Sequence, residues 1–152
     1  ISPLHLSHIE YLSYFRLQKK VKKVYPYAQK AKTQLQEIEE DLIYAESKKE
    51  KRRISQLHDR WLREHFTEDL KKLTRSEGRI LIKLIHYKTG ISSYDLIKKY
   101  RNGLTALLWQ KLAKLYDGNL KTKYQPEYVR EDQWISHILR EIEIHDSLKK
   151  NE

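Results

Sequence analysis

Apolar and aromatic side chains recur at alternating steps of three and four residues over the first third of the chain. The series is Tyr14, Leu17, Val21, Val24, Ala28, Ala31, Leu35, Ile38, Leu42 and Ala45. This spacing is a heptad seam, which is typical of a long amphipathic helix that packs on another helix. Pro26 lies inside the series, where proline removes a backbone donor and crowds the preceding turn. Because the seam keeps its phase across Pro26, it predicts two coaxial helices or one kinked helix, not a domain boundary.

A second amphipathic series follows a polar connector near residues 47–51. Its apolar members are Ile54, Leu57, Trp61, Leu62, Phe66, Leu70 and Leu73. The short connector predicts that this helix folds back antiparallel on the first one, as in a helical hairpin. A dimeric coiled coil is the alternative explanation of the same seam.

The next segment predicts a helix that is buried on nearly all sides. Thr74 and Glu77 have the spacing of a capping box, with Thr74 as the N-cap, and Gly90 has the position of a C-cap glycine. Between them, the apolar residues cover most of the helix circumference, which indicates a central position in the fold. These residues are Ile80, Leu81, Ile82, Leu84 and Ile85.

The remaining chain predicts three further helices. Ser92 or Ser93 caps a short helix that ends before residues 102–103, and a second helix covers residues 104–116. An extended stretch around residues 119–126 leads to an amphipathic C-terminal helix at about residues 131–149. We therefore predict one all-α domain over residues 1–152, a long antiparallel helical hairpin packed on a cluster of shorter helices around a central buried helix.

Composition agrees with this architecture. The 152 residues are the size of one domain, and 39% apolar and 34% charged residues with only 4 Gly and 3 Pro favour long helices over a sheet. No uncharged apolar run approaches the ~18 residues of a membrane span. Cys is absent, which excludes disulfides, thiolate nucleophiles and Cys-based zinc sites. The chain starts at Ile1 and lacks Met, so we expect either that an N-terminal segment was removed, with a signal peptide as the natural candidate, or that the sequence is a fragment of a longer chain.

The net charge of +10 suits nucleic acid, anionic lipid headgroups or an acidic protein partner. The cations are spread over several predicted helices and are interleaved with acids, so most of them are expected to lie on solvated helix faces.

No catalytic motif is present. The seven His residues include no His-Glu-x-x-His pattern, and there is no nucleophile elbow, phosphate-binding loop or dinucleotide fingerprint. His58 and His65 are seven residues apart, which is too far along a helix for them to chelate one metal by themselves, and a site shared with His86 is a minor alternative. Paired glycosidase carboxylates need not be close in sequence, and nothing here favours them. We predict no catalytic residue, no metal site and no cofactor.

A long motif carries a family resemblance. It begins Leu-Thr-Arg-Ser-Glu-Gly-Arg-Ile-Leu-Ile-Lys-Leu-Ile at Leu73 and continues to Tyr124, and Val24-Tyr25-Pro26-Tyr27-Ala28 precedes it. Over about residues 20–125 the chain resembles a bacterial family of the Bacteroidota known as domain of unknown function 4294. The matched motif residues are Gly78, Arg79, Lys83, Thr89, Tyr94, Arg101, Gly103, Trp109, Gln110, Asn119, Lys121 and Tyr124.

The chain departs from the family pattern at a few positions. His86-Tyr87 replaces an acidic-then-basic pair, Glu77 replaces a Gln, and Leu107-Leu108 replaces two aromatic residues. The resemblance implies an exported protein of the periplasm or of the periplasmic face of an envelope membrane. It implies no activity, substrate or cofactor.

Arg79 and Lys83 lie four residues apart, on one face of the predicted central helix. A cation on so apolar a helix must reach water or find a partner. Either these cations pair inside the protein with Glu77, Asp95 or helix C-terminal carbonyls, or they form an anion-accepting pocket for a partner's carboxylate or an anionic small molecule. The candidate binding residues are Gly78, Arg79, Lys83, Tyr94, Arg101, Trp109, Gln110 and Lys121.

These observations predict a non-enzymatic binding or scaffold protein of the bacterial cell envelope that engages another protein. The alternative is a basic nucleic-acid-binding helical domain. Against that alternative, the basic runs belong to different helices, and none has a base-reading surface beside a helix-turn-helix glycine. A third hypothesis is a peripheral membrane contact through residues 19–23, near Tyr14, Phe15 and Tyr25. The oligomeric state is left open.

Overall fold

The computed structural model describes residues 5–92, 95 and 122–152. Four helices are found there: α1 (His8–Ile43), α2 (Lys48–Lys71), α3 (Arg75–Thr89) and α6 (Arg130–Lys150). None of these described residues is in a strand. The predicted all-α class is confirmed. The helices predicted between α3 and α6 lie outside the described residues except at the start of the first one, where Ser92 Oγ accepts a hydrogen bond from the Asp95 backbone N–H, as an N-cap does.

Helix α1 is a single helix of 36 residues with Pro26 inside it, which decides between the two predicted arrangements. Its N-cap is Ser7, whose Oγ accepts a hydrogen bond from the backbone N–H of Glu10. Five seam residues are buried, whereas the others are only partly covered. The buried five are Leu17, Val21, Val24, Ala28 and Ile38.

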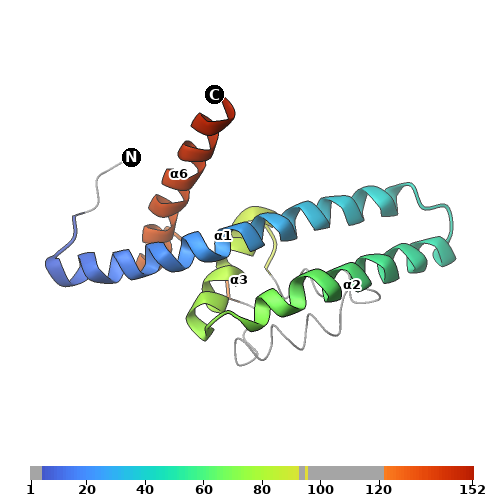
Figure 1. Cartoon of the computed structure of the whole chain (residues 1–152), viewed down its shortest axis with the longest axis horizontal. Helices are drawn as coiled ribbons and strands as arrows, with labels where there is room; N and C mark the ends of the chain where they lie inside the picture. Colours follow the sequence, from blue (N-terminus) through green and yellow to red (C-terminus); the bar gives the residue numbers. More distant parts are fainter. Residues whose placement is uncertain (1–4, 93–94, 96–121) are drawn as a thin grey trace.

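Helices α1 and α2 form the predicted antiparallel hairpin, with the C-terminal half of α1 beside α2 (Figure 1). Part of their contact is polar, because His58 of α2 lies 2.6 Å from the Gln34 side chain and 2.8 Å from the Asp41 carboxylate. Leu57 was expected on the packed face of α2, but it is 53% exposed. That expectation was wrong because polar side chains occupy part of the helix contact that an apolar seam was expected to fill.

Helix α3 is the central helix. The capping box at its start is complete, since Glu77 N donates to Thr74 Oγ1 (3.2 Å) and Thr74 N donates to Glu77 Oε1 (3.1 Å). Gly90 ends the helix in the left-handed region with φ 75°, a conformation that costs glycine little. Ile80, Leu81, Ile82 and Leu84 are all at most 2% exposed, as the sequence predicts.

Helix α6 completes the hydrophobic core where α1 and α3 meet. Ile135, Ile138 and Leu139 of α6 are fully or almost fully buried in the same apolar cluster as residues of α1 and α3. Trp134 packs edge-on against Tyr14 of α1, with ring centroids 6.0 Å apart. The end of α6 projects away from the body of the molecule (Figure 1), and Leu148 near this end is exposed. Among the described helices, none is long and apolar enough to cross a membrane.

Candidate functional site

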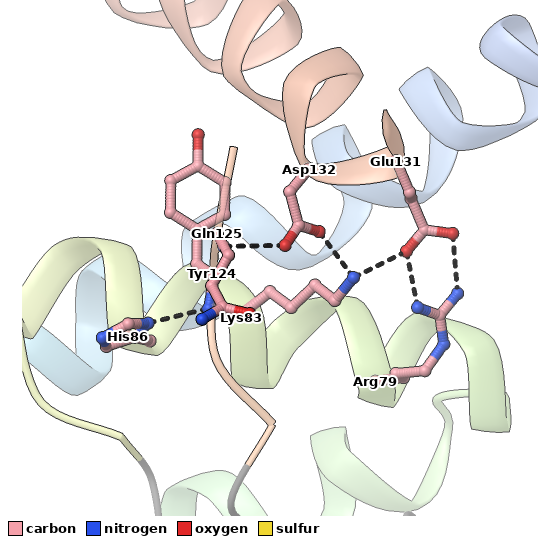
Figure 2. Close-up of polar contacts among 7 residues, drawn as sticks. All are labelled: Arg79, Lys83, His86, Tyr124, Gln125, Glu131 and Asp132. Carbon is pink, nitrogen blue, oxygen red and sulfur yellow. Dashed lines mark hydrogen bonds and ion pairs between the residues drawn. The ribbon is translucent and has the colours of Figure 1, made fainter. Parts of the chain in front are cut away.

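Two cations of α3 meet two carboxylates of α6 (Figure 2). Lys83 Nζ lies 2.5 Å from Asp132 Oδ1 and 3.1 Å from Glu131 Oε1. The Arg79 guanidinium contacts Glu131 with both terminal nitrogens, Nη1 at 2.5 Å from Oε1 and Nη2 at 3.0 Å from Oε2. This two-point contact is the arrangement that arginine and carboxylate geometry favours.

Local structure places these four side chains. Arg79 and Lys83 are one turn apart on α3 and therefore project from the same face. Glu131 and Asp132 stand in the first turn of α6, where the positive end of the helix dipole favours acids. Asp132 is held from a second side as well, because its Oδ2 accepts a hydrogen bond from the Gln125 backbone N–H at 2.8 Å.

The cluster has a buried part and an open part. The side chains of Lys83 and Asp132 are 7% and 0% exposed, whereas those of Arg79 and Glu131 are 43% and 33% exposed. Transfer of a charge out of water is costly unless the charge is paired and hydrogen-bonded. Among the described residues, Lys83 and Asp132 meet that condition through each other, Glu131 and the Gln125 N–H.

The cations act on the ionisation of Glu131. Burial by itself raises the pKa of the Glu131 carboxyl, but the hydrogen bonds from Arg79 and Lys83 outweigh burial and bring this pKa below its usual value. Glu131 is therefore held ionised in the folded protein.

His86 ties the segment before α6 to the central helix. The Tyr124 backbone N–H donates to His86 Nδ1 at 2.8 Å (Figure 2). Burial, together with the nearby charge of Lys123, lowers the pKa of His86, while Asp132 opposes that shift. Nδ1 can accept this hydrogen bond only in the neutral ring, so the lowered pKa agrees with the observed contact.

The structure brings together Arg79 and Lys83, as predicted, and buries Gly78 beside them, where its N–H donates to the Thr74 carbonyl. The partners observed for the two cations are Glu131 and Asp132 of α6, which sequence reasoning did not anticipate. Among the partners it did name, Glu77 contacts Lys23 at 2.7 Å, and Asp95 accepts a hydrogen bond from Ser92 Oγ. The other predicted binding residues lie outside the described residues: Tyr94, Arg101, Trp109, Gln110 and Lys121.

A signal for the missing partners was present in the sequence. Two adjacent acids open the predicted C-terminal helix, and acids in a first turn are common. The sequence does not show that Asp132 is completely buried, and this burial is what distinguishes Asp132 from other acids in the first turn of a helix.

The ion pairs of this cluster link α3 to α6. The heads of Lys83 and Arg79 already contact the protein's own carboxylates, so a further anion would have to displace a carboxylate of α6. The described residues also contain no group of three or more His, Asp or Glu side chains that could hold a metal ion.

A groove of about 940 Å³ runs between α1 and α2. It is lined on α1 by Pro26, Gln29, Lys30, Thr33, Gln34, Glu37 and Asp41, and on α2 by Leu57, His58, Trp61, His65 and Asp69. Its α2 wall contains Trp61 stacked on His65, with ring centroids 4.6 Å apart. This groove combines exposed apolar surface with carboxylates.

No curated protein and no solved structure matches the chain. One family model does match, and it covers residues 4–141, a wider range than the 20–125 that the motif suggested. The chain therefore belongs to the family described as Domain of unknown function (DUF4294).

Proposed function

We propose that the chain is a non-enzymatic binding domain of the bacterial cell envelope that engages another protein. The observation that carries the proposal is the groove between α1 and α2. Arg79 and Lys83 already contact the chain's own carboxylates, Glu131 and Asp132, whereas the groove offers accessible side chains of mixed chemistry.

The groove specifies the chemistry of its partner. Leu57, 53% exposed, and Trp61 offer apolar contact area. Three carboxylates, those of Glu37, Asp41 and Asp69, and one cation, Lys30, line the same groove, so acids outnumber Lys and Arg there in a protein of net charge +10. An apolar partner segment flanked by Lys or Arg matches this combination, because charge complementarity selects and orients a partner.

The wall of the groove is held in place by polar contacts between the two helices. His58 lies between Gln34 and Asp41 of α1, at 2.6 Å and 2.8 Å. A preformed wall lowers the ordering cost of binding. Placement in the envelope rests on the family resemblance, which implies export.

Site-specific photo-crosslinking in the native cell tests the proposal. A photoreactive amino acid at Leu57 or at exposed Thr33 should give a discrete adduct with one protein. The same amino acid at Ile43, 76% exposed and outside the groove, is the matched control. Leu57→Glu should abolish the adduct formed from position 33, because it removes apolar contact area and adds a charge.

Cell fractionation of the adduct tests the location separately. Recovery in the periplasmic or membrane fraction supports the envelope assignment, and recovery in the cytosol contradicts it. Equal crosslinking from Ile43 and from the groove positions would refute the groove as the binding surface.

A further inference from the structure

The outer face of the first four turns of α1 has no packing partner among the described elements. This face is apolar in its first half and cationic in its second half. We infer that this face docks on the surface of an anionic lipid bilayer. The N-terminal face comprises Ile9, Tyr11, Leu12, Phe15, Arg16, Lys19 and Lys22.

The first half of the N-terminal face is apolar and open to solvent. Ile9 is 78% exposed, Tyr11 and Leu12 are each 50% exposed, and Phe15 is 42% exposed. Tyr11 and Phe15 form an edge-to-face pair with ring centroids 4.7 Å apart, so the two rings make one aromatic projection. These turns of α1 extend beyond α3, with α6 as the helix beside them (Figure 1).

The second half of the same face is cationic. Lys19 lies four residues after Phe15 and seven after Leu12, spacings that keep all three on one side of a helix. Lys22 follows Phe15 by seven residues, and Arg16, Lys19 and Lys22 are all exposed. Residues 11–36 contain no Asp or Glu. The preceding acid, Glu10, is bound by Arg130 at 2.5 Å, and Glu141 of α6 accepts a hydrogen bond from Gln18.

A bilayer surface accounts for both halves. Apolar and aromatic side chains enter the boundary between headgroups and acyl chains, while the flexible Lys and Arg side chains reach the phosphates. Duplex nucleic acid would satisfy the cations but would leave four apolar side chains in water. An interfacial helix of this kind lies on the membrane and does not span it, which agrees with the polar and charged residues along α1.

Vesicle sedimentation with the whole chain tests the inference. The protein should pellet with vesicles of equal parts phosphatidylcholine and phosphatidylglycerol, and much less with phosphatidylcholine alone, and salt should weaken the binding. Lys19→Gln with Lys22→Gln should lower the partition coefficient about 25-fold, at about fivefold per Lys. Leu12→Ser with Phe15→Ser should lower it at least about tenfold, because apolar insertion is lost.

The control variants replace exposed side chains of the same kinds outside the N-terminal face. Ile43→Ser with Tyr44→Ser at the hairpin tip, and Lys48→Gln with Lys51→Gln in α2, should leave vesicle binding within a factor of about two. Thermal unfolding should show that all four double variants remain folded, since every replaced side chain is substantially exposed.

Several results would overturn the inference. They are failure of the wild-type protein to pellet with anionic vesicles, equal loss in the control variants, and duplex DNA binding in place of vesicle binding. A dimer in solution that Leu12→Ser with Phe15→Ser dissociates would instead assign the face to a second copy of the chain. Loss of vesicle binding leaves the crosslinks from Leu57 unaffected, so the inference and the proposed function fail independently.

Discussion

Lys83 of α3 and Asp132 of α6 form a buried ion pair that we expect to be important for stability. Both side chains are almost completely buried, and each neutralises the other across 2.5 Å. Removal of one member of a buried pair leaves an uncompensated charge, which is far more destabilising than loss of the attraction itself. Arg79 differs from Lys83, because its side chain is 43% exposed and water can replace much of the hydrogen bonding that the Glu131 carboxylate provides.

We therefore expect Lys83→Ala to lower the free energy of unfolding by about 3–5 kcal/mol and Arg79→Ala by about 1 kcal/mol or less. Urea unfolding monitored by circular dichroism measures both. Lys71→Ala is the matched control, because Lys71 pairs with Glu68 on the surface, and it should cost about 0.5 kcal/mol at most. Lys83→Met with Asp132→Asn should recover part of the loss, since no buried charge remains unpaired.

If Lys83→Ala and Arg79→Ala proved equally mild, the cluster would contribute little to stability. The hypothesis of an anion-accepting pocket would then regain weight. Loss of partner capture without loss of stability would point the same way.

At the scale of elements, α1 is unusual because one helix continues through Pro26. Proline in a helix interior removes a hydrogen bond and crowds the carbonyl of the preceding turn. The flanking seam overcomes this cost, since Val21, Val24 and Ala28 on either side of Pro26 are all fully buried against the core. Pro26 itself is exposed, so its ring adds little packing in return.

Replacement of Pro26 by Ala should therefore stabilise the protein by about 1–3 kcal/mol, because Ala restores the hydrogen bond and has the higher helix propensity. Thermal unfolding measures the gain. Ala substitution at exposed Lys22, in the same helix, is the control and should change stability by about 0.5 kcal/mol at most. A loss of stability in the Pro26 variant would mean that a bend at this residue is needed for α1 to pack on both α3 and α2.

At the scale of the whole molecule, the segment before α6 joins distant parts of the chain. The Tyr124 N–H bonds to His86 on α3, and the Gln125 N–H bonds to Asp132 on α6. The ring of Tyr124 also packs edge-on against Tyr87, with centroids 5.4 Å apart. The position of α6 on α3 is therefore linked to the protonation state of His86.

This link predicts a pH dependence of stability. The pKa of His86 in the folded protein lies below its ordinary value of 6.5, so the folded state favours the neutral ring. The contribution of His86 to the free energy of unfolding is complete above pH 6.5. It is lost as the pH falls from 6.5 through the lower pKa of the folded state. Glu131 and Glu77, whose pKa values are lowered from 4.5, lose their contributions only at more acidic pH. Urea unfolding between pH 6.5 and 4.5 should therefore show a falling free energy of unfolding.

His86→Asn provides the control for this titration. The Asn side-chain oxygen can accept the Tyr124 hydrogen bond in place of Nδ1 but does not titrate. The variant should show a smaller pH dependence over the same range. An unchanged slope would assign the effect to another histidine, and an NMR titration that gave His86 a pKa of 6.5 or above would contradict the burial argument.

Local features of the sequence predicted the helices and their ends. The alternating three- and four-residue spacing of α1, the capping box of Thr74 and Glu77, and Gly90 all act within a few residues of chain. The apolar circumference of α3 likewise indicated its central position, because only burial on all sides satisfies such a surface.

Tertiary structure alone decided which groups meet. Lys83 and Asp132 are 49 residues apart, and Arg79 and Glu131 are 52 apart, so their pairing depends on how α6 lies on α3. The polar contact of Gln34 with His58 and the exposure of Leu57 depend in the same way on how α2 lies beside α1. Helix formation requires only neighbouring residues, whereas the partner of a buried charge is determined by the packing of whole helices.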